Sequence, residues 1–332
     1  MSRRRTAVLG LLSGALACGP GTPPETARVT IPRGATVSAV AESLQARGVI
    51  RSARTFRFYA RLTGRQRAIP AGTYDLPRDL GARRALAELL GARVAEVRLV
   101  VPEGLMLTEI ATLADSALDI SADSFLAAAR NPALAADLGI PATTLEGYLY
   151  PSTYLVPVDA TAEAVVRQMT AEFQRRWRPV WDTRLKTLTR SRHEIVVLAS
   201  IVEGEVRDPL DAPYVASVYH NRLARGMRLQ ADPTVIYALG RRRRLFERDY
   251  LTRSPYNTYL IDGLPPSPVG QPSATSIQAA LYPARTDFLF FVARSDGRHV
   301  FSRTLREHLR AIAAVRRPAP RPSAPRQPAG GQ

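Results

Sequence analysis

The chain has 332 residues, of which 45% are hydrophobic, so it is long enough for one large or two modest globular domains and too polar to span a membrane many times. Its formal net charge is +17, and Lys186 is the only lysine among the 46 basic residues, so arginine carries almost all of the positive charge. A balance this basic indicates an anionic partner, such as nucleic acid, phospholipid or an acidic polymer.

The first eighteen residues have the pattern of an export signal. Three consecutive arginines at 3–5 precede an apolar stretch at 7–17, and small residues lead to Cys18, the only cysteine. We expect a lipidated cysteine at this position, with an uncleaved anchor or ordinary secretion as the alternatives. Each of the three carries the rest of the protein across the cytoplasmic membrane. This argues against nucleic acid as the partner and favours a polyanionic envelope surface.

A small α+β module is predicted at residues 28–92, after a flexible tether at 19–27. Thr36 is expected to cap its first helix, because Thr is a favoured N-cap residue. The predicted elements, from hydrophobic periodicity and turn residues, are a strand at 28–32, helices at 36–47 and 55–62, a turn and strand at 69–77, and a helix at 82–90.

A larger mixed α+β region is predicted at residues 97–317, so the fold class of the chain is α+β. The tail at 318–332 has too few apolar residues to offset the entropy of ordering, and we expect it to be disordered. The predicted elements are a strand at 98–101, helices at 107–118 and 160–177, an aromatic-rich loop at 145–157, a helix within 194–206, a loop at 207–213, helices at 214–225 and 275–280, and a hairpin around Asp296.

The segment EIVVLASIVEGEV at 194–206 places a carboxyl group at the end of an apolar helical stripe. Leu198, Ile201, Val202 and Glu205 have the i, i+3, i+4, i+7 spacing of one helix face. Burial raises the pKa of a carboxyl group, which gives the protonated state that a general acid needs near neutral pH. From this segment alone, a helix cap or an ion-pair partner is the alternative role for Glu205.

The chain lacks the sequence signatures of several enzyme classes. It contains no HExxH, no paired cysteine ligands, no GxSxG and no P-loop, and its four histidines are scattered, so no metal or cofactor is expected. The run Arg241–Arg244 is either a polyanion-binding patch or a solvated loop, and the sequence leaves both open.

Five ordered segments resemble the YceG-like family of endolytic murein transglycosylases, which cleave peptidoglycan glycan strands at the bacterial cytoplasmic membrane. The segments are VPEGLMLTEIA at 101–111, LEGYLYPSTY at 145–154, LASIVEGE at 198–205, NRLARGMRLQADPTVIY at 221–237 and YNTYLIDGLPPSPVGQPS at 256–273. The resemblance implies a LysM-like domain at 28–92, which contacts glycan or places the active site, and a catalytic domain at 97–317.

The resemblance also implies the catalytic residue, because the family's acid is the second glutamate of a VExE pair, which is Glu205 here. Relatives often have Lys and Thr where this chain has Gly204 and Val206. Glycine lowers helix propensity by up to about 1 kcal/mol relative to alanine. We therefore expect the helix to end or bend near Glu205, without an adjacent hydroxyl to hold the carboxyl group.

The implied reaction is non-hydrolytic. Glu205 would protonate the glycosidic oxygen between N-acetylmuramic acid and N-acetylglucosamine, and would then accept a proton from the muramic C6 hydroxyl as that group closes a 1,6-anhydro ring. An internal nucleophile has a high effective molarity, so a second carboxylate is not obligatory. Glu203 is the rival carboxylate, as a supporting group or as a base for water.

Several polar residues are predicted to bind substrate or to support the site. Asp232 is also expected to be the N-cap of a helix that begins at Pro233, and Tyr148 could equally be a core residue. The predicted set is Gln230, Asp232, Thr234, Tyr256, Asn257 and Tyr259, with Glu146 and Tyr148 as outer members.

The leading hypothesis is a lytic transglycosylase anchored by its N-terminus to the cytoplasmic membrane, with its catalytic domain on the outer side. Glycan strands are the expected partner, and glycan synthases are further partners implied by the resemblance. The alternatives are a muramidase that hydrolyses the same bond and a non-catalytic glycan-binding scaffold. Gly19 lacks the aspartate that retains enteric lipoproteins at the inner membrane, so the choice of membrane stays open.

Overall fold

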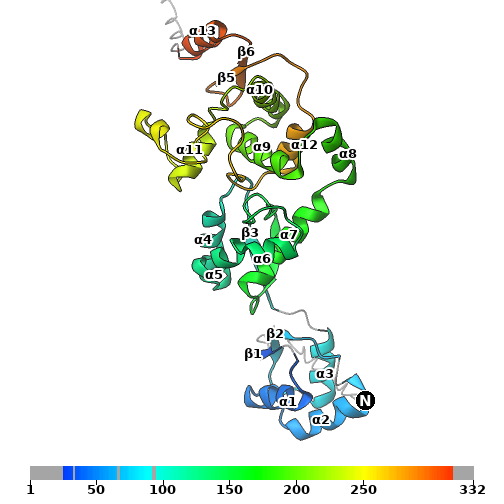
Figure 1. The fold of residues 1–332 in the computed structure, drawn as a ribbon. Coiled ribbons are helices and arrows are strands. Elements are labelled where there is room, and N and C mark those ends of the chain that lie inside the picture. The colour runs from blue at the N-terminus through cyan, green and yellow to red at the C-terminus, as the bar shows by residue number, and fades with distance from the viewer. Residues whose placement is uncertain (1–24, 33, 66–67, 92–94, 317–332) are drawn as a thin grey trace, which may run out of the picture. The chain divides into compact units, whose positions relative to one another are not determined.

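The computed structural model describes residues 25–32, 34–65, 68–91 and 95–316. The predicted signal with Cys18, most of the tether and the tail at 318–332 lie outside these ranges. The chain divides into two compact units between Ala95 and Glu96, and each is described by itself (Figure 1). Within the described ranges, every helix is too short or too polar to cross a bilayer.

The small unit, over its described residues, combines one antiparallel pair of strands with three helices. Val29 of the first strand lies opposite Tyr74 of the second, and both side chains are buried. Thr36 caps the first helix as predicted, since its hydroxyl accepts the N–H of Ala39 at 3.2 Å. The elements are β1 (Thr26–Ile31), α1 (Val37–Ala46), α2 (Ala53–Leu62), β2 (Gly72–Pro77) and α3 (Ala82–Gly91).

The large unit is mostly helical, with short antiparallel strand pairs β3–β4 and β5–β6. The predicted α+β class is therefore confirmed. Its elements are β3 (Glu96–Val100), α4 (Leu107–Leu118), α5 (Ala122–Ala129), α6 (Pro132–Asp137), β4 (Thr153–Pro157), α7 (Ala162–Arg176), α8 (Pro179–Leu188), α9 (Arg192–Glu205), η2 (Pro209–Asp211), α10 (Ala212–Ala224), α11 (Asp232–Leu239), η3 (Glu247–Leu251), α12 (Ala274–Leu281), β5 (Phe290–Ala293), β6 (His299–Ser302) and α13 (Leu305–Val315).

The prediction of a loop throughout 145–157 is wrong at its C-terminal end. Residues 153–157 form β4, which pairs with β3 so that Tyr154 lies opposite Leu99, and both side chains are buried. The partner strand lies more than fifty residues earlier in the chain. A strand stabilised mainly by such a distant partner has only a weak local signal.

Helix α9 lies at the centre of the large unit, with α10 and α12 beside it (Figure 1). It begins with a capping box, in which Ser191 and Glu194 satisfy each other's backbone N–H groups. All side chains from Ile195 to Val202 are buried, so these two turns form a core helix rather than a surface helix. The helix ends at Glu205, as predicted, because Val206 has extended backbone angles.

Candidate active site

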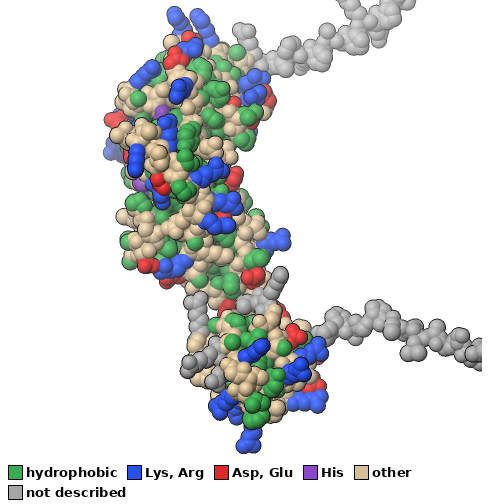
Figure 2. All heavy atoms as spheres, turned by 90° about the vertical axis from the view of Figure 1, so that its right-hand side faces the viewer, with side chains coloured by type: hydrophobic (Ala, Val, Ile, Leu, Met, Phe, Trp, Pro, Cys, Tyr) green, Lys and Arg blue, Asp and Glu red, His purple; other side chains and the backbone are tan. Residues whose placement is uncertain are grey.

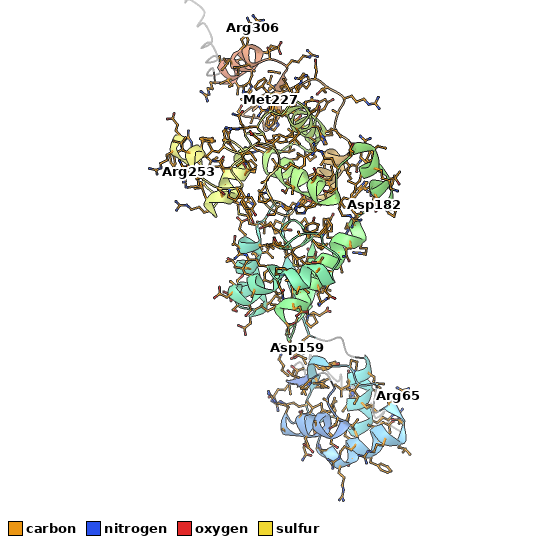
Figure 3. All side chains as sticks on the ribbon, in the orientation of Figure 1. Arg65, Asp159, Asp182, Met227, Arg253 and Arg306 are labelled. Carbon is orange, nitrogen blue, oxygen red and sulfur yellow. The ribbon has the colours of Figure 1, made fainter. Side chains whose placement is uncertain are left out.

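A cleft of about 800 Å³ lies beside the C-terminal end of α9. Its walls come from the end of α9, the connection between α10 and α11, the start of α11, the β5–β6 pair and α13. Met227, labelled in Figure 3, lies in the connection between α10 and α11. The polar residues that line the cleft include Glu205, Arg222, Gln230, Asp232 and Tyr259.

Glu205 is the last residue of α9, and its partly buried side chain borders the cleft. Its Oε1 accepts a hydrogen bond from the Tyr219 hydroxyl at 2.9 Å. Burial, followed by the nearby carboxylate of Asp232, raises the pKa of Glu205 to about 7. The hydrogen bonds from Tyr219 and from the Asp232 backbone, and the charge of Arg222, act in the opposite direction. Near neutral pH the group can therefore both donate and accept a proton.

Asp232 faces the same cleft, but the prediction that it is a helix N-cap is wrong. It is the first residue of α11, and Ala231, with extended backbone angles, occupies the N-cap position. The carboxylate is engaged elsewhere: its Oδ1 accepts the Tyr259 hydroxyl at 2.7 Å and its Oδ2 accepts the Tyr250 hydroxyl at 3.5 Å. Because these tyrosines hold the side chain, it does not turn back to bind the amides of its own helix.

Gly204 permits the close packing of α11 against α9. A Cβ atom at this position would lie 2.6 Å from Cγ of Pro233, which is far inside van der Waals contact. The sequence predicted only a weakened helix here. The structure shows in addition that the missing side chain lets the start of α11, and with it Asp232, approach Glu205.

Tyr219 and Arg222 of α10 are site residues that the sequence did not single out for a role. The hydroxyl expected to be absent beside Glu205 is supplied by Tyr219 from this second helix. The buried guanidinium of Arg222 donates hydrogen bonds to the carbonyls of Leu229 and Leu289, both at 2.7 Å. The spacing of Tyr219 and Arg222, three residues apart on a predicted helix, was the signal that both face one side.

Gln230 and Tyr259 also line the cleft, as the sequence grouped them. Gln230 is exposed and has a positive φ of 50°, and its backbone N–H is held by the carbonyl of Thr258 at 3.1 Å. A left-handed backbone is uncommon for a residue with a side chain. The hydrogen bond to Thr258 fixes it and turns the chain into α11.

Three of the predicted binding residues lie behind the cleft rather than in its lining. The Thr234 hydroxyl donates to the carbonyl of Ala231 at 2.6 Å, and Asn257 donates to the carbonyls of Tyr250 and Thr252. The Tyr256 hydroxyl lies 2.7 Å from that of Ser267. The Thr234 hydroxyl also lies 2.9 Å from that of Thr258, which joins the start of α11 to the loop that carries Tyr259.

Glu203 and Glu146 lie in other environments. Glu203 accepts the N–H and the hydroxyl of Ser273, the N-cap of α12, at 2.9 and 2.6 Å. Glu146 is 2% exposed, and its carboxyl group accepts hydrogen bonds from Gln271 at 2.6 Å and from the Tyr237 hydroxyl at 3.1 Å. Burial raises the pKa of Glu146 to about 8. Neither residue belongs to the cleft lining.

Tyr148, the other outer candidate, is fully buried. Its hydroxyl lies 2.8 Å from Nδ1 of His193, and its ring packs edge-on against Phe173. Of the two readings that the sequence left open, core packing is the one that its environment supports. No group of three or more His, Cys, Asp and Glu side chains within the described ranges could hold a metal ion.

The arginine run at 241–244 is partly engaged within the protein. Arg242 pairs with Glu109 at 2.7 Å, and Arg243 pairs with Asp249 at 2.6 Å. Arg241 and Arg244 are exposed. The run is therefore neither wholly a solvated loop nor a continuous patch of free cations.

Comparison with known proteins identifies the family. The model of the YceG-like family matches residues 29–314. The chain belongs to the YceG-like family. A relative in Bacillus subtilis strain 168, named endolytic murein transglycosylase, is 33% identical over an alignment of 303 residues, and the match covers 86% of this chain and 84% of the relative. These matches confirm the predicted resemblance, and with it an enzyme of the lytic transglycosylase class.

Two further similarities agree with this assignment. An endolytic murein transglycosylase of Streptococcus pneumoniae D39 is 30% identical over 318 residues, and the match spans 86% of this chain but 57% of that protein. The crystal structure of a YceG-like protein from Listeria monocytogenes matches with a TM-score of 0.61 and 33% identity. That match covers 87% of this chain and 99% of the other.

Proposed function

We propose that this YceG-like protein is an endolytic peptidoglycan lytic transglycosylase that cleaves the bond between N-acetylmuramic acid and N-acetylglucosamine and leaves 1,6-anhydro ends. The observation that carries the proposal is the carboxyl group of Glu205, which borders a large cleft and accepts a hydrogen bond from Tyr219, and whose pKa burial raises to about 7. The names of the relatives in Bacillus and Streptococcus support the same activity.

In the first step Glu205 donates its proton to the glycosidic oxygen, so that the N-acetylglucosamine oxygen leaves with that proton while positive charge develops at the muramic anomeric carbon. In the second step the carboxylate accepts the proton of the muramic C6 hydroxyl, whose oxygen attacks the same carbon and closes the anhydro ring. Glu205 is then protonated again and no water is consumed. A pKa of about 7 suits a group that must donate a proton in one step and accept one in the next.

Asp232 supports Glu205 in two ways. Its negative charge disfavours ionisation of Glu205 and so helps to keep the acid protonated. Its carboxylate, oriented by Tyr259, also lines the cleft in which positive charge develops, where a fixed negative charge is stabilising. Gln230 and Tyr259 would bind the sugar amides and hydroxyls from the same wall.

The other predicted residues would act through position. Thr234 would join the start of α11 to the loop that carries Tyr259, Tyr256 and Asn257 would hold that loop, and Glu203 would hold the start of α12. Glu146 is held within the core by Gln271 and Tyr237, and Tyr148 packs beside His193 at the end of α9 opposite Glu205.

A muramidase is the second candidate, because Asp232 supplies a second carboxylate near Glu205. Hydrolysis would add water at the anomeric carbon and leave reducing muramic ends. Mass spectrometry of the products from purified glycan strands separates the two reactions, since anhydro ends are one water lighter. Reducing ends alone would replace the transglycosylase proposal with the muramidase.

A glycan-binding scaffold would release neither product, and its test is the same digest.

The proposed domain at 28–92 would contact glycan, as the LysM-like resemblance implies. A chain that lacks these residues should bind sacculi more weakly than the intact chain, and unchanged binding would remove that role.

We further propose lipidation at Cys18 and action on nascent strands at the outer face of the cytoplasmic membrane, beside glycan synthases. The motif around Cys18 supports this, although it lies outside the described residues. Labelled fatty acid should be incorporated into the wild type and not into Cys18→Ser. Equal labelling of the two proteins would exclude this cysteine.

A further inference from the structure

Helix α2 of the small unit carries an exposed apolar pair bordered by arginines. Phe58 and Leu62 are 68% and 70% exposed and four residues apart, so they share one face of the helix. Arg54 precedes Phe58 by four residues and Arg61 follows it by three, so both border the pair. Arg65, labelled in Figure 3, lies in the turn directly after the helix.

Within the described residues, the arginines of this face have no acidic partner. Helix α2 contains no acidic residue, and every Asp and Glu of the protein lies within the described residues. Arg54, Arg61 and Arg65 take part in none of the ion pairs there. Among the described arginines of the small unit, those that form ion pairs are Arg28, Arg51, Arg57, Arg78 and Arg84.

We propose that this face of α2, formed by Arg54, Phe58, Arg61 and Leu62, binds the surface of a bilayer that contains anionic phospholipid. Such a surface presents phosphates for the guanidinium groups and, just beneath them, an apolar layer for the aromatic and aliphatic side chains. In Figure 2 the small unit shows green hydrophobic side chains among blue basic ones. A glycan strand offers no apolar layer into which Leu62 could insert.

The inference does not depend on the chemistry of Glu205 or on the lipidation of Cys18. A chain that begins at residue 19 keeps both hydrophobic cores, which lie wholly after it. Its co-sedimentation with vesicles therefore measures the α2 face without the N-terminal signal. We expect binding to vesicles of phosphatidylcholine mixed with phosphatidylglycerol, and little binding to phosphatidylcholine alone.

Two double variants test the basic and the apolar side chains of this face separately. Arg54→Gln with Arg61→Gln should weaken binding to the anionic vesicles about 30-fold, since each basic residue near such a surface contributes about one kcal/mol, which is roughly fivefold. Phe58→Ser with Leu62→Ser should weaken it by at least about tenfold, because the apolar contribution is lost. Thermal unfolding should be unchanged in both, because these side chains are exposed.

Matched controls exclude a general effect of charge or exposed apolar area. Leu210 is 69% exposed but lies between Asp208 and Asp211, and Leu210→Ser should bind as the wild type does. Arg98→Gln with Arg253→Gln removes the same charge from the large unit and should lower binding by less than about threefold.

Three results would overturn the proposal. One is equal binding to neutral and anionic vesicles, and another is equal loss in the α2 variants and their controls. The third is an α2 double variant that loses binding to purified sacculi or loses self-association while its vesicle binding is unchanged. Arg61 also borders a groove at the β1–α1 connection, so the sacculus measurement separates a glycan surface from a lipid surface.

Discussion

The cleft around Glu205 and the enclosed site around Glu146 contain the same chemical group in two settings. Burial raises the pKa of both, to about 7 and about 8, and a tyrosine hydroxyl donates to each, Tyr219 at 2.9 Å and Tyr237 at 3.1 Å. They differ in access, because Glu205 borders a cleft whereas Glu146 is enclosed by protein. A raised pKa therefore indicates an acid of use in catalysis only where a substrate can reach it.

The largest effect that this comparison predicts is on catalysis. Glu205→Gln should lower strand cleavage by about 100- to 10,000-fold, because general acid and base catalysis contributes a factor of this size. Glu146→Gln should change cleavage by less than about fivefold. Rates should be measured on purified glycan strands at equal concentrations of folded protein. Comparable losses in the two variants would contradict the distinction between the sites.

The next effect is on the free energy of unfolding, which should depend more on Glu146 than on Glu205. Glu146→Ala leaves the buried donors of Gln271, Tyr237 and the Leu107 backbone without their acceptor, and should lower the free energy of unfolding by about 3 kcal/mol. Glu146→Gln should cost less, because it keeps the side chain's volume and one oxygen. Urea unfolding measures both, and an unchanged midpoint for Glu146→Ala would show that its network is not stabilising.

A smaller effect concerns the packing that brings Asp232 towards Glu205. Gly204→Ala should lower stability by about 1–2 kcal/mol, because the added methyl group meets Pro233 and the cost of overpacking exceeds the gain in helix propensity. Cleavage should fall as well, since α11 moves away from α9. Gly91→Ala at the end of α3 is the matched control for loss of a glycine, because a Cβ there would meet nothing and the backbone is not left-handed. A more stable, fully active Gly204→Ala protein would contradict this explanation.

The smallest effects are on pH dependence. In the proposed mechanism cleavage needs protonated Glu205, so its rate should fall as the pH rises through about 7. Asp232→Asn removes the neighbouring charge and lowers the pKa of Glu205, so the fall should begin at lower pH, with a loss of a few-fold at pH near 8. A pH–rate profile of the residual activity tests this, and a fall that moves to higher pH would show that Asp232 does not act on Glu205 by its charge.

Stability has a related pH dependence. Burial raises the pKa of Glu205 in the folded protein above its ordinary value of 4.5, so its protonated form contributes stability that is present below about 4.5 and lost as the pH rises through about 7. Glutamine does not titrate, so Glu205→Gln does not lose stability in this way as the pH rises. Calorimetry should therefore show that the variant gains stability relative to the wild type between pH 5 and 8. A constant difference over this range would show that Glu205 is not held protonated by the fold.

The sequence predicted those features that local patterns determine. The capped helix after Thr36, the apolar face that ends at Glu205 and the end of α9 beside Gly204 all follow from spacing and capping within one helix. The family followed from five ordered motifs. Such features need no knowledge of distant contacts.

The features that were missed depend on contacts between distant segments. Strand β4 forms because β3 pairs with it, and the hydroxyl that holds Glu205 comes from Tyr219, fourteen residues later and in another helix. The Asp-Pro pair predicts an N-cap at Asp232, but Tyr259 holds its carboxylate instead. The motif around Glu146 does not show that its side chain is enclosed, which depends on distant segments such as that of Gln271.

The most direct test is a muropeptide analysis of purified glycan strands digested by the wild type, Glu205→Gln and Glu146→Gln. We expect 1,6-anhydro ends from the wild type and from Glu146→Gln, and almost none from Glu205→Gln. Anhydro ends at the wild-type rate from Glu205→Gln would show that the carboxyl group in the cleft is not the acid.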